Sequence, residues 1–269
     1  RRTANRRHAR LYQNMEVLGL NAGVFSRTAT DGLTSNRVTL NVVGSCIDTL
    51  ESKIAKNRPR ALFLTEDGNF ALQQKAKKLT KYVDGAMDAM DFHTNNQRSF
   101  KDSCIFGTGA VKFFKQDGQV MCERSSIDEI IIDDAEAIYG HPQQLHQVRY
   151  VHRDKPLEMF PKYARQISDA TPGLGADAMA LGVKDIIRVV ESWHLKSGAE
   201  SKDGRHAIVI DECTLYAEKY EKDYFPFVWH FWKTRVTGFF GLGVSEELTG
   251  IQLEINKLFR RIQRAQHLM

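Results

Sequence analysis

The chain has 269 residues, 42% hydrophobic and 26% charged, which is enough to bury the core of one large globular domain or two ordinary ones. No apolar run approaches the roughly 20 residues of a membrane-spanning helix, and no signal-peptide core is present. The net charge of +5 arises at one place, because residues 1–10 hold five of the 38 bases and no acid, leaving 33 of each sign in the other 259 residues.

Residues 1–35 are basic and then rich in Gly, Thr, Ser and Asn, a composition that predicts a basic flexible arm and a loop. Such an arm either contacts nucleic acid or an acidic partner, or is a solvated terminus, which is commoner. The first residue is not Met, so we expect the chain to be part of a longer protein. Four cysteines without a CxxC spacing predict reduced core residues: Cys46, Cys104, Cys122 and Cys213.

Two helices are expected next. The first begins at Asn41, carries apolar residues at helical spacing and ends before Pro59. The second begins near Phe70 and extends toward Ile105, although "HTNNQR" interrupts its apolar stripe and "FGTG" ends it. We expect this second helix to share one core with the aromatic strands, with these residues buried near Trp193 and Trp229: Leu79, Val83 and Met87.

The middle of the chain predicts antiparallel strands. "AVKFFKQDGQVMCER" indicates a hairpin closed at Asp117-Gly118, and residues 185–196 and 205–212 flank a loop at Asp203-Gly204. Further strands are expected over residues 127–133, 145–153 and 225–233, a short helix over 157–170, and a loop over 171–182. Helices at both ends with strands between them, and no βαβ order, predict an α+β fold in which long helices flank antiparallel strands and hairpins.

The last segment, residues 243–269, predicts a long helix. Ser245 is a suitable N-cap, and Glu246 and Glu247 follow in the first turn. Over 25 residues the helix would be about 37 Å long. It either docks on its own domain or packs against missing chain or other subunits. Its apolar seam has heptad spacing: Leu248, Ile251, Ile255, Leu258, Ile262, Ala265 and Met269.

Four basic residues lie on one stripe of this helix, almost opposite the seam, at spacings i, i+3, i+4 and i+7. The stripe is either solvated surface or a contact with DNA or a neighbouring subunit. We take it as the candidate site: Lys257, Arg260, Arg261 and Arg264.

Signals for catalysis are weak. "GFFGLG" and "FGTG" lack the GK[ST] of a phosphate loop, and no G-x-S-x-G elbow occurs. His141, His146 and His152 have no standard metal spacing. We therefore expect no cofactor, no metal and no enzymatic activity. The alternative is a metal-dependent nucleic-acid enzyme that uses the carboxylates after a predicted strand: Asp133, Asp134 and Glu136.

Aromatic residues crowd into positions 193–240, either as a sheet core or as a subunit contact. Together with this crowding, the order of segments resembles the portal proteins, or head-to-tail connectors, of short-tailed bacteriophages. The matching stretches span residues 36–269 and include "LNVVGSCIDTLESKIAKNRPR", "TEDGNFALQQKAKKL", "FGTGAVKFF", "DGQVMCERSSIDEIIIDDAEAIYGHP", "VESWHLKSG", "DGRHAIVI", "FPFVWHFW" and "GFFGLGVSEELTGIQLEINKL".

The resemblance implies a structural subunit of a ring, typically a dodecamer, at one capsid vertex of the virion, assembled in the host cytoplasm. Its implied partners are other copies of itself, double-stranded DNA, capsid and scaffolding proteins, the packaging motor (terminase) and tail adaptor proteins, with no membrane. Residues 36–242 would match the family's wing and residues 243–269 the start of its stem helix. The clip, tunnel loop and crown would be absent from this sequence, so we expect it to be the N-terminal part of a portal.

Overall fold

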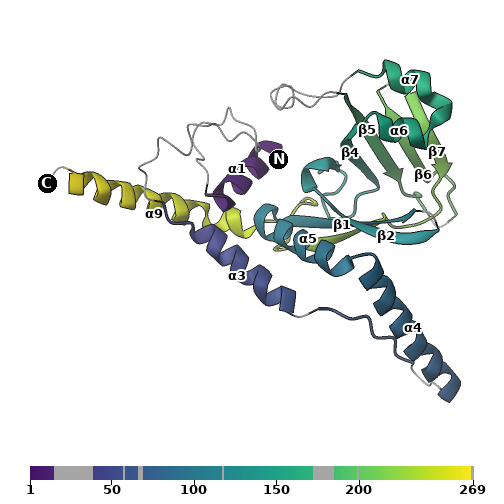
Figure 1. Ribbon diagram of the computed structural model, residues 1–269, viewed down its shortest axis with the longest axis horizontal. Helices are drawn as coiled ribbons and strands as arrows, with labels where there is room; N and C mark the ends of the chain where they lie inside the picture. Colours follow the sequence, from purple (N-terminus) through teal and green to yellow (C-terminus); the bar gives the residue numbers. More distant parts are fainter. Residues whose placement is uncertain are drawn as a thin grey trace.

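The computed structural model describes residues 1–14, 39–56, 58–65, 69–116, 118–171, 185–198, 200–211 and 213–267. Two antiparallel sheets form a body, helices cover it on several sides, and a long helix ends the chain (Figure 1). This arrangement confirms the predicted α+β class and the long C-terminal helix.

The first sheet has the strand order β2-β1-β8. Its centre is the predicted hairpin, in which β1 (Thr108–Gln116) pairs with β2 (Gln119–Ser125) up to Gln116 opposite Gln119, next to Gly118 with φ 82°. The aromatic strand β8 (Phe227–Phe231) pairs with the other edge of β1. The sheet therefore joins strands from the middle and the end of the chain.

The second sheet has the order β3-β4-β5-β6-β7. The short helix η1 (Ile127–Glu129) leads into β3 (Ile130–Ile131), which is followed by β4 (Gln144–His152), β5 (Ile186–His194) and β6 (Arg205–Ile210). Sequence patterns indicated these strands but not β7 (Cys213–Lys219), which pairs with β6. Short helices pack beside this sheet: α6 (Asp154–Met159), η2 (Pro161–Tyr163) and α7 (Ala164–Asp169).

Two apolar clusters hold the layers together. One lies where the two sheets meet and contains Trp193, Phe227 and Phe239, with Trp229 packed against them. For these residues the aromatic crowding in the sequence is a sheet core. The second cluster joins helices α3 (Val42–Lys56), α5 (Phe92–Phe106) and α9 (Val244–His267). Its buried members are Val43, Ile47, Cys104, Ile105 and Val244.

The N-terminal arm is not flexible where the structure describes it. Residues Arg2–Tyr12 form helix α1, whose Ala9 and Leu11 are buried against the body. Asn5 Nδ2 donates to Asp128 Oδ1 at 2.6 Å, and the Arg1 guanidinium lies 3.7 Å from the centroid of Phe240. The arginine-rich composition predicted a flexible arm, and the amphipathic helix was not recognised. Long basic side chains can cover apolar surface while their charged ends stay in water. Residues 15–35 of the predicted arm lie outside the described residues.

The long second helix is two helices, so the prediction of its core was wrong. Helix α4 (Phe70–Ala89) ends at Met90, and Asp91 turns the chain with φ 53° before α5 begins. No residue of α4 is buried; Leu79 is 44% exposed, and Val83 and Met87 are half-buried outside the clusters. Because the chain turns at Asp91, α5 and not α4 packs on β1 and β2.

Glycines bring two loops into main-chain contact where α9 leaves the body. Gly107 ends α5 with φ 89°, and a Cβ on it would lie 2.3 Å from the carbonyl oxygen of Gly241. A Cβ on Gly243, directly before α9, would lie 2.8 Å from the amide of Gly107. Trp232 N donates to Gly107 O at 3.2 Å. The two glycine-rich stretches thus separate secondary-structure elements and also touch each other.

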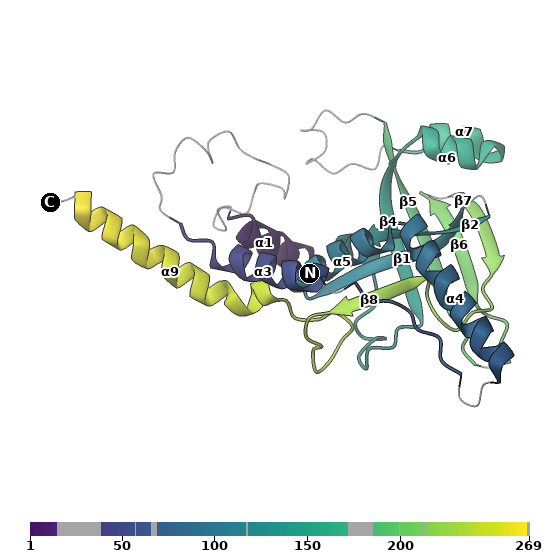
Figure 2. The same cartoon turned by 60° about the horizontal axis from the view of Figure 1, so that its bottom comes forward.

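Two helices project from the body. In both views α9 extends away from the sheets, and in Figure 1 α4 extends from the opposite end of the molecule (Figures 1 and 2). The first turns of α9 contact α1, α3 and α5, whereas α4 makes its main contact with α5 alone.

Candidate nucleic-acid and subunit interface

The first turn of α9 is fixed to the loop that follows β8. Glu246 N and Glu247 N donate to Gly243 O at 3.1 and 3.2 Å. The side chain of Arg235 pairs with Glu246 at 2.6 Å, and Lys233 pairs with Glu247. These carboxylates also favour the positive end of the helix dipole. Ser245, the predicted N-cap, lies instead inside the first turn with its Oγ buried and without a hydrogen-bond partner.

The face of α9 that contacts the body is centred on the side-chain amides of Gln252 and Asn256, not on the predicted apolar seam. Gln252 is buried, and its Oε1 accepts from Val42 N at 2.8 Å and from Val43 N at 3.3 Å. Gln252 Nε2 donates to Leu40 O, and Asn256 Oδ1 accepts from Leu40 N at 3.2 Å. The first amides of a helix lack partners within it, so Gln252 acts as a cap for α3 supplied by another helix.

The seam turns away from the body. Ile251, Leu258 and Ile262 are each 55% exposed, although they are large apolar side chains at helical spacing. Leu248, in the first turns, does pack against the second cluster. The sequence left open whether the helix docks on its own domain. Its start docks, and within the described residues nothing covers the later part of the seam.

The basic stripe lies on the same projecting part of α9. Lys257 Nζ pairs with Glu254 at 2.6 Å, and the hydrogen bond from Lys257 lowers the pKa of Glu254. Arg260 is half-buried, and its Nε has no hydrogen-bond partner, whereas Arg261 and Arg264 are exposed. One continuous helix at i, i+3, i+4 and i+7 brings all four onto one face, as expected. Arg261 and Arg264 are the two arginines of this face that are exposed to solvent, where a phosphate or a carboxylate can reach them.

The carboxylates of the alternative enzyme site make separate local contacts. Asp133 Oδ1 accepts from Ala135 N at 2.9 Å, and Glu136 Oε1 accepts from Gln143 N at 3.2 Å. Asp134 points toward a pocket of about 800 Å³. In the part of the chain that the structure describes, no three His, Cys, Asp or Glu side chains are grouped to hold a metal ion.

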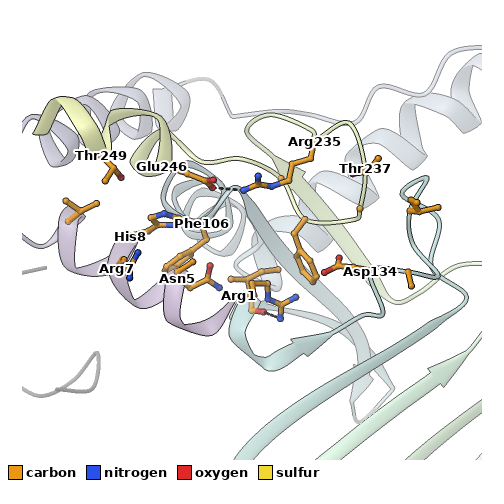
Figure 3. A pocket seen from close by; sticks show the side chains of 18 residues that line it. Arg1, Asn5, Arg7, His8, Phe106, Asp134, Arg235, Thr237, Glu246 and Thr249 are labelled. Atoms are coloured by element: carbon orange, nitrogen blue, oxygen red, sulfur yellow. Dashed lines mark hydrogen bonds and ion pairs between the residues drawn. The ribbon is translucent and has the colours of Figure 1, made fainter. Parts of the chain in front are cut away.

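That pocket lies between α1, the loop after β8 and the turn before β4 (Figure 3). Arg7 and His8 enter from α1, and the Arg235–Glu246 ion pair lies beside them. Burial lowers the pKa of His8, and its Nδ1 has no hydrogen-bond partner. The pocket mixes cations with carboxylates, so its lining favours no single charge of ligand.

The other candidate ligands for metals are used in ordinary contacts. His146 Nδ1 lies 2.8 Å from Ser192 Oγ, and His152 Nδ1 lies 3.1 Å from Asp154. The four cysteines are free thiols, as predicted. Burial raises the pKa of Cys104 to about 11 and also raises the pKa of Cys122, which favours the unreactive thiol over the thiolate.

Sequence patterns missed a charged network between the two sheets. Lys112 is buried, and its Nζ donates to Gln147 Oε1 at 3.0 Å and to Glu191. His206 bridges Glu191 and Glu218 at 3.0 Å each, and Trp193 stacks on its ring. Burial lowers the pKa of Lys112, whereas bonds from His206 and Lys112 lower the pKa of Glu191 despite its burial. The network joins titratable residues from four strands, β1, β5, β6 and β7, and it can be recognised only after the strand pairing is known.

No protein-family model matches the sequence, and the comparison with curated proteins gives no match. Among the described helices, none combines the length and apolar character needed to cross a bilayer.

Proposed function

We propose that this protein is a portal subunit, a structural component of a ring at one vertex of a bacteriophage capsid through which double-stranded DNA passes. The observation that carries the proposal is helix α9. It leaves the body with its apolar seam exposed and with Arg261 and Arg264 exposed on another face. A seam of this kind suits side-by-side packing of α9 between copies, and a basic face suits phosphates or an acidic neighbour. The order of segments that resembles portal proteins supports the same assignment.

In this proposal residues 36–242 are the wing and residues 243–269 begin the stem. The ring would hold DNA loosely, because a conduit must let DNA slide, and weak contacts repeated in every subunit suffice. The capsid and scaffolding proteins, the packaging motor and the tail adaptors are the proposed partners, and the virion is the proposed location. The protein itself would have no catalytic role.

Ring formation is the decisive test. Sedimentation velocity and negative-stain electron microscopy of the protein should give a closed ring whose mass is a multiple of 30.7 kDa. The variant Leu258→Asp/Ile262→Asp should remain monomeric with an unchanged circular dichroism spectrum, because both side chains are half exposed in the single copy. A wild-type protein that stays monomeric at all concentrations, with and without DNA, would contradict the proposal.

DNA contact is tested separately by the salt dependence of binding. In fluorescence anisotropy with a duplex, the slope of log K against log salt should shrink by about 2 for Arg261→Gln/Arg264→Gln, since each lost phosphate contact releases about one counterion fewer. The matched control is Lys155→Gln/Arg165→Gln, which removes two exposed cations, one on α6 and one on α7. Equal slopes for both variants would remove α9 from the DNA-binding surface.

A further inference from the structure

Residues 58–65 and helix α4, together called the α4 arm, expose a group of large apolar side chains. The segment is held to the helix by Phe63 N donating to Thr80 Oγ1 at 3.3 Å and by Arg60 lying 3.9 Å from Asp84. Neither contact covers the apolar residues. Those that are exposed are Leu62, Leu64, Phe70, Leu72, Leu79 and Tyr82.

One face of α4 mixes these apolar groups with lysines. Leu72, Lys75, Leu79 and Tyr82 follow each other at spacings of three and four, and Lys78 is adjacent, so all five lie on one side of the helix. The lysines are exposed, and no carboxylate among the described residues pairs with them. The face therefore fits a surface that is acidic and apolar at once.

The same chain carries a surface of that character. Residues 132–139, called the acidic turn, lie between β3 and β4, and residues 127–140 contain five acids and no base. Asp133 and Glu136 are exposed, and beside them the large side chains of Ile138 and Tyr139 are exposed as well. The turn is held in place by the buried Ala137 and by Gly238 N donating to Ile138 O at 3.0 Å.

We propose that the α4 arm of one copy docks on the acidic turn of the next copy. Charge complementarity selects this occupant: Lys75 and Lys78 would meet Asp133 and Glu136, and Leu79 and Tyr82 would meet Ile138 and Tyr139. Two different surfaces meet, so the contact is head-to-tail, and repetition of such a contact closes a ring when its rotation permits. This proposal rests on the proposed ring function. It adds a second contact between neighbouring copies, made by the α4 arm and the acidic turn and separate from the α9 seam.

The test is a charge swap read by sedimentation equilibrium. Lys75→Glu/Lys78→Glu should weaken self-association about tenfold, and so should Asp133→Asn/Glu136→Gln. The second variant keeps a side-chain oxygen at each position, so the hydrogen bonds from Ala135 N and Gln143 N can still form. Glu136→Lys alone and Lys78→Glu alone should each weaken self-association. A chain that carries both changes should regain most of the lost affinity, because the exchanged charges still attract each other. The control Lys155→Glu/Arg165→Glu should leave association unchanged.

The outcomes separate this contact from the proposed function. Rings of unchanged affinity in all charge variants would overturn the contact while leaving the portal assignment standing. Loss of association without rescue in the swapped pair would also overturn it, because the two surfaces would not touch. A wild-type protein that never self-associates but cosediments with phosphatidylserine vesicles through Lys75 and Lys78 would assign the arm to a membrane surface and contradict both proposals.

Discussion

In the sheet body, charged groups are buried and partnered, whereas on α4 and α9 apolar groups are exposed. Lys112 lies between the sheets with Gln147 and Glu191, while Leu79 on α4 and Leu258 on α9 are about half in solvent. The body pairs the charges of this buried network within one chain, and the two helices leave apolar surface for something else to cover. We therefore expect substitutions of buried residues in the body to change folding stability, and substitutions on the exposed faces of α4, α9 and the acidic turn to change association.

The largest expected effect is the loss of Lys112. Lys112→Met should lower the free energy of unfolding by about 3–5 kcal/mol, because Glu191 keeps a buried charge with one cationic partner fewer. Urea denaturation measures it. Adding Glu191→Gln should recover part of the loss, and Lys75→Met on α4 should stay within about 0.5 kcal/mol of the wild type. Equal effects of the two lysine substitutions would show that the network does not stabilise the body.

A pair of leucine truncations compares the body with α4 directly. Leu145→Ala should cost about 2–5 kcal/mol, because the side chain is fully buried in the sheet cluster. Leu79→Ala should cost less than about 1 kcal/mol, because water already reaches nearly half of the side chain. Thermal unfolding of the monomeric form measures both. A larger loss for Leu79→Ala would place α4 in the folding core after all.

A pair of glycine substitutions should have opposite signs. A Cβ on Gly109 would lie 1.9 Å from the carbonyl oxygen of Ser99, so Gly109→Ala must shift main chain and should cost about 1–3 kcal/mol. A Cβ on Gly85, inside α4, meets nothing within 4 Å, so Gly85→Ala should raise stability by about 0.5–1 kcal/mol. Chemical denaturation of both variants tests the pair, and destabilisation by Gly85→Ala would reveal a neighbour that covers α4.

The smallest expected effect is a pH dependence from His206. Burial alone would lower its pKa, but the hydrogen bonds to Glu191 and Glu218 outweigh burial and raise it. The stabilisation is therefore complete below the unfolded value of about 6.5 and is lost as pH rises through the higher folded pKa. The slope cannot exceed about 1.4 kcal/mol per pH unit for one proton.

His206→Gln should flatten the fall in stability above pH 6.5 in urea titrations at several pH values. On the acid side, the lowered pKa values of Glu191 and Glu218 give stability that is lost as pH falls through their folded values. That second limb should remain in the His206→Gln variant, although reduced. An unchanged slope above pH 6.5 would mean that His206 binds no extra proton in the folded state.

Local patterns predicted the elements whose signals are contained in their own residues. The β1–β2 hairpin follows from a turn at Gly118 between alternating side chains, and α9 follows from a 24-residue helical period. The turn at Asp91 was missed, because a single left-handed residue has no sequence pattern of its own, and the break in the apolar stripe at residues 93–98 was not recognised as the start of a new helix. Strand β7 was missed because the stretch "CTLYAEK" forms a strand by pairing with β6, and that pairing cannot be read from its own residues.

For the candidate site, the sequence predicted which residues share a face but not what that face contacts. The spacing of Lys257, Arg261 and Arg264 determines their common side of α9. Which side docks depends on Gln252, whose amide bonds to the start of α3, about 210 residues earlier in the chain. A polar residue on the docked face cannot be recognised from hydrophobic periodicity, so the exposure of the seam became visible only in three dimensions.

The contact of Gly107 with Gly241 and Gly243 has a mechanical consequence. Main chain rests on main chain at the point where α9 leaves the body, with no side chain between them that could change rotamer. A change in the angle of α9 at this point would therefore have to move the backbone at the junction of α5 and β1, because no side chain could yield in its place.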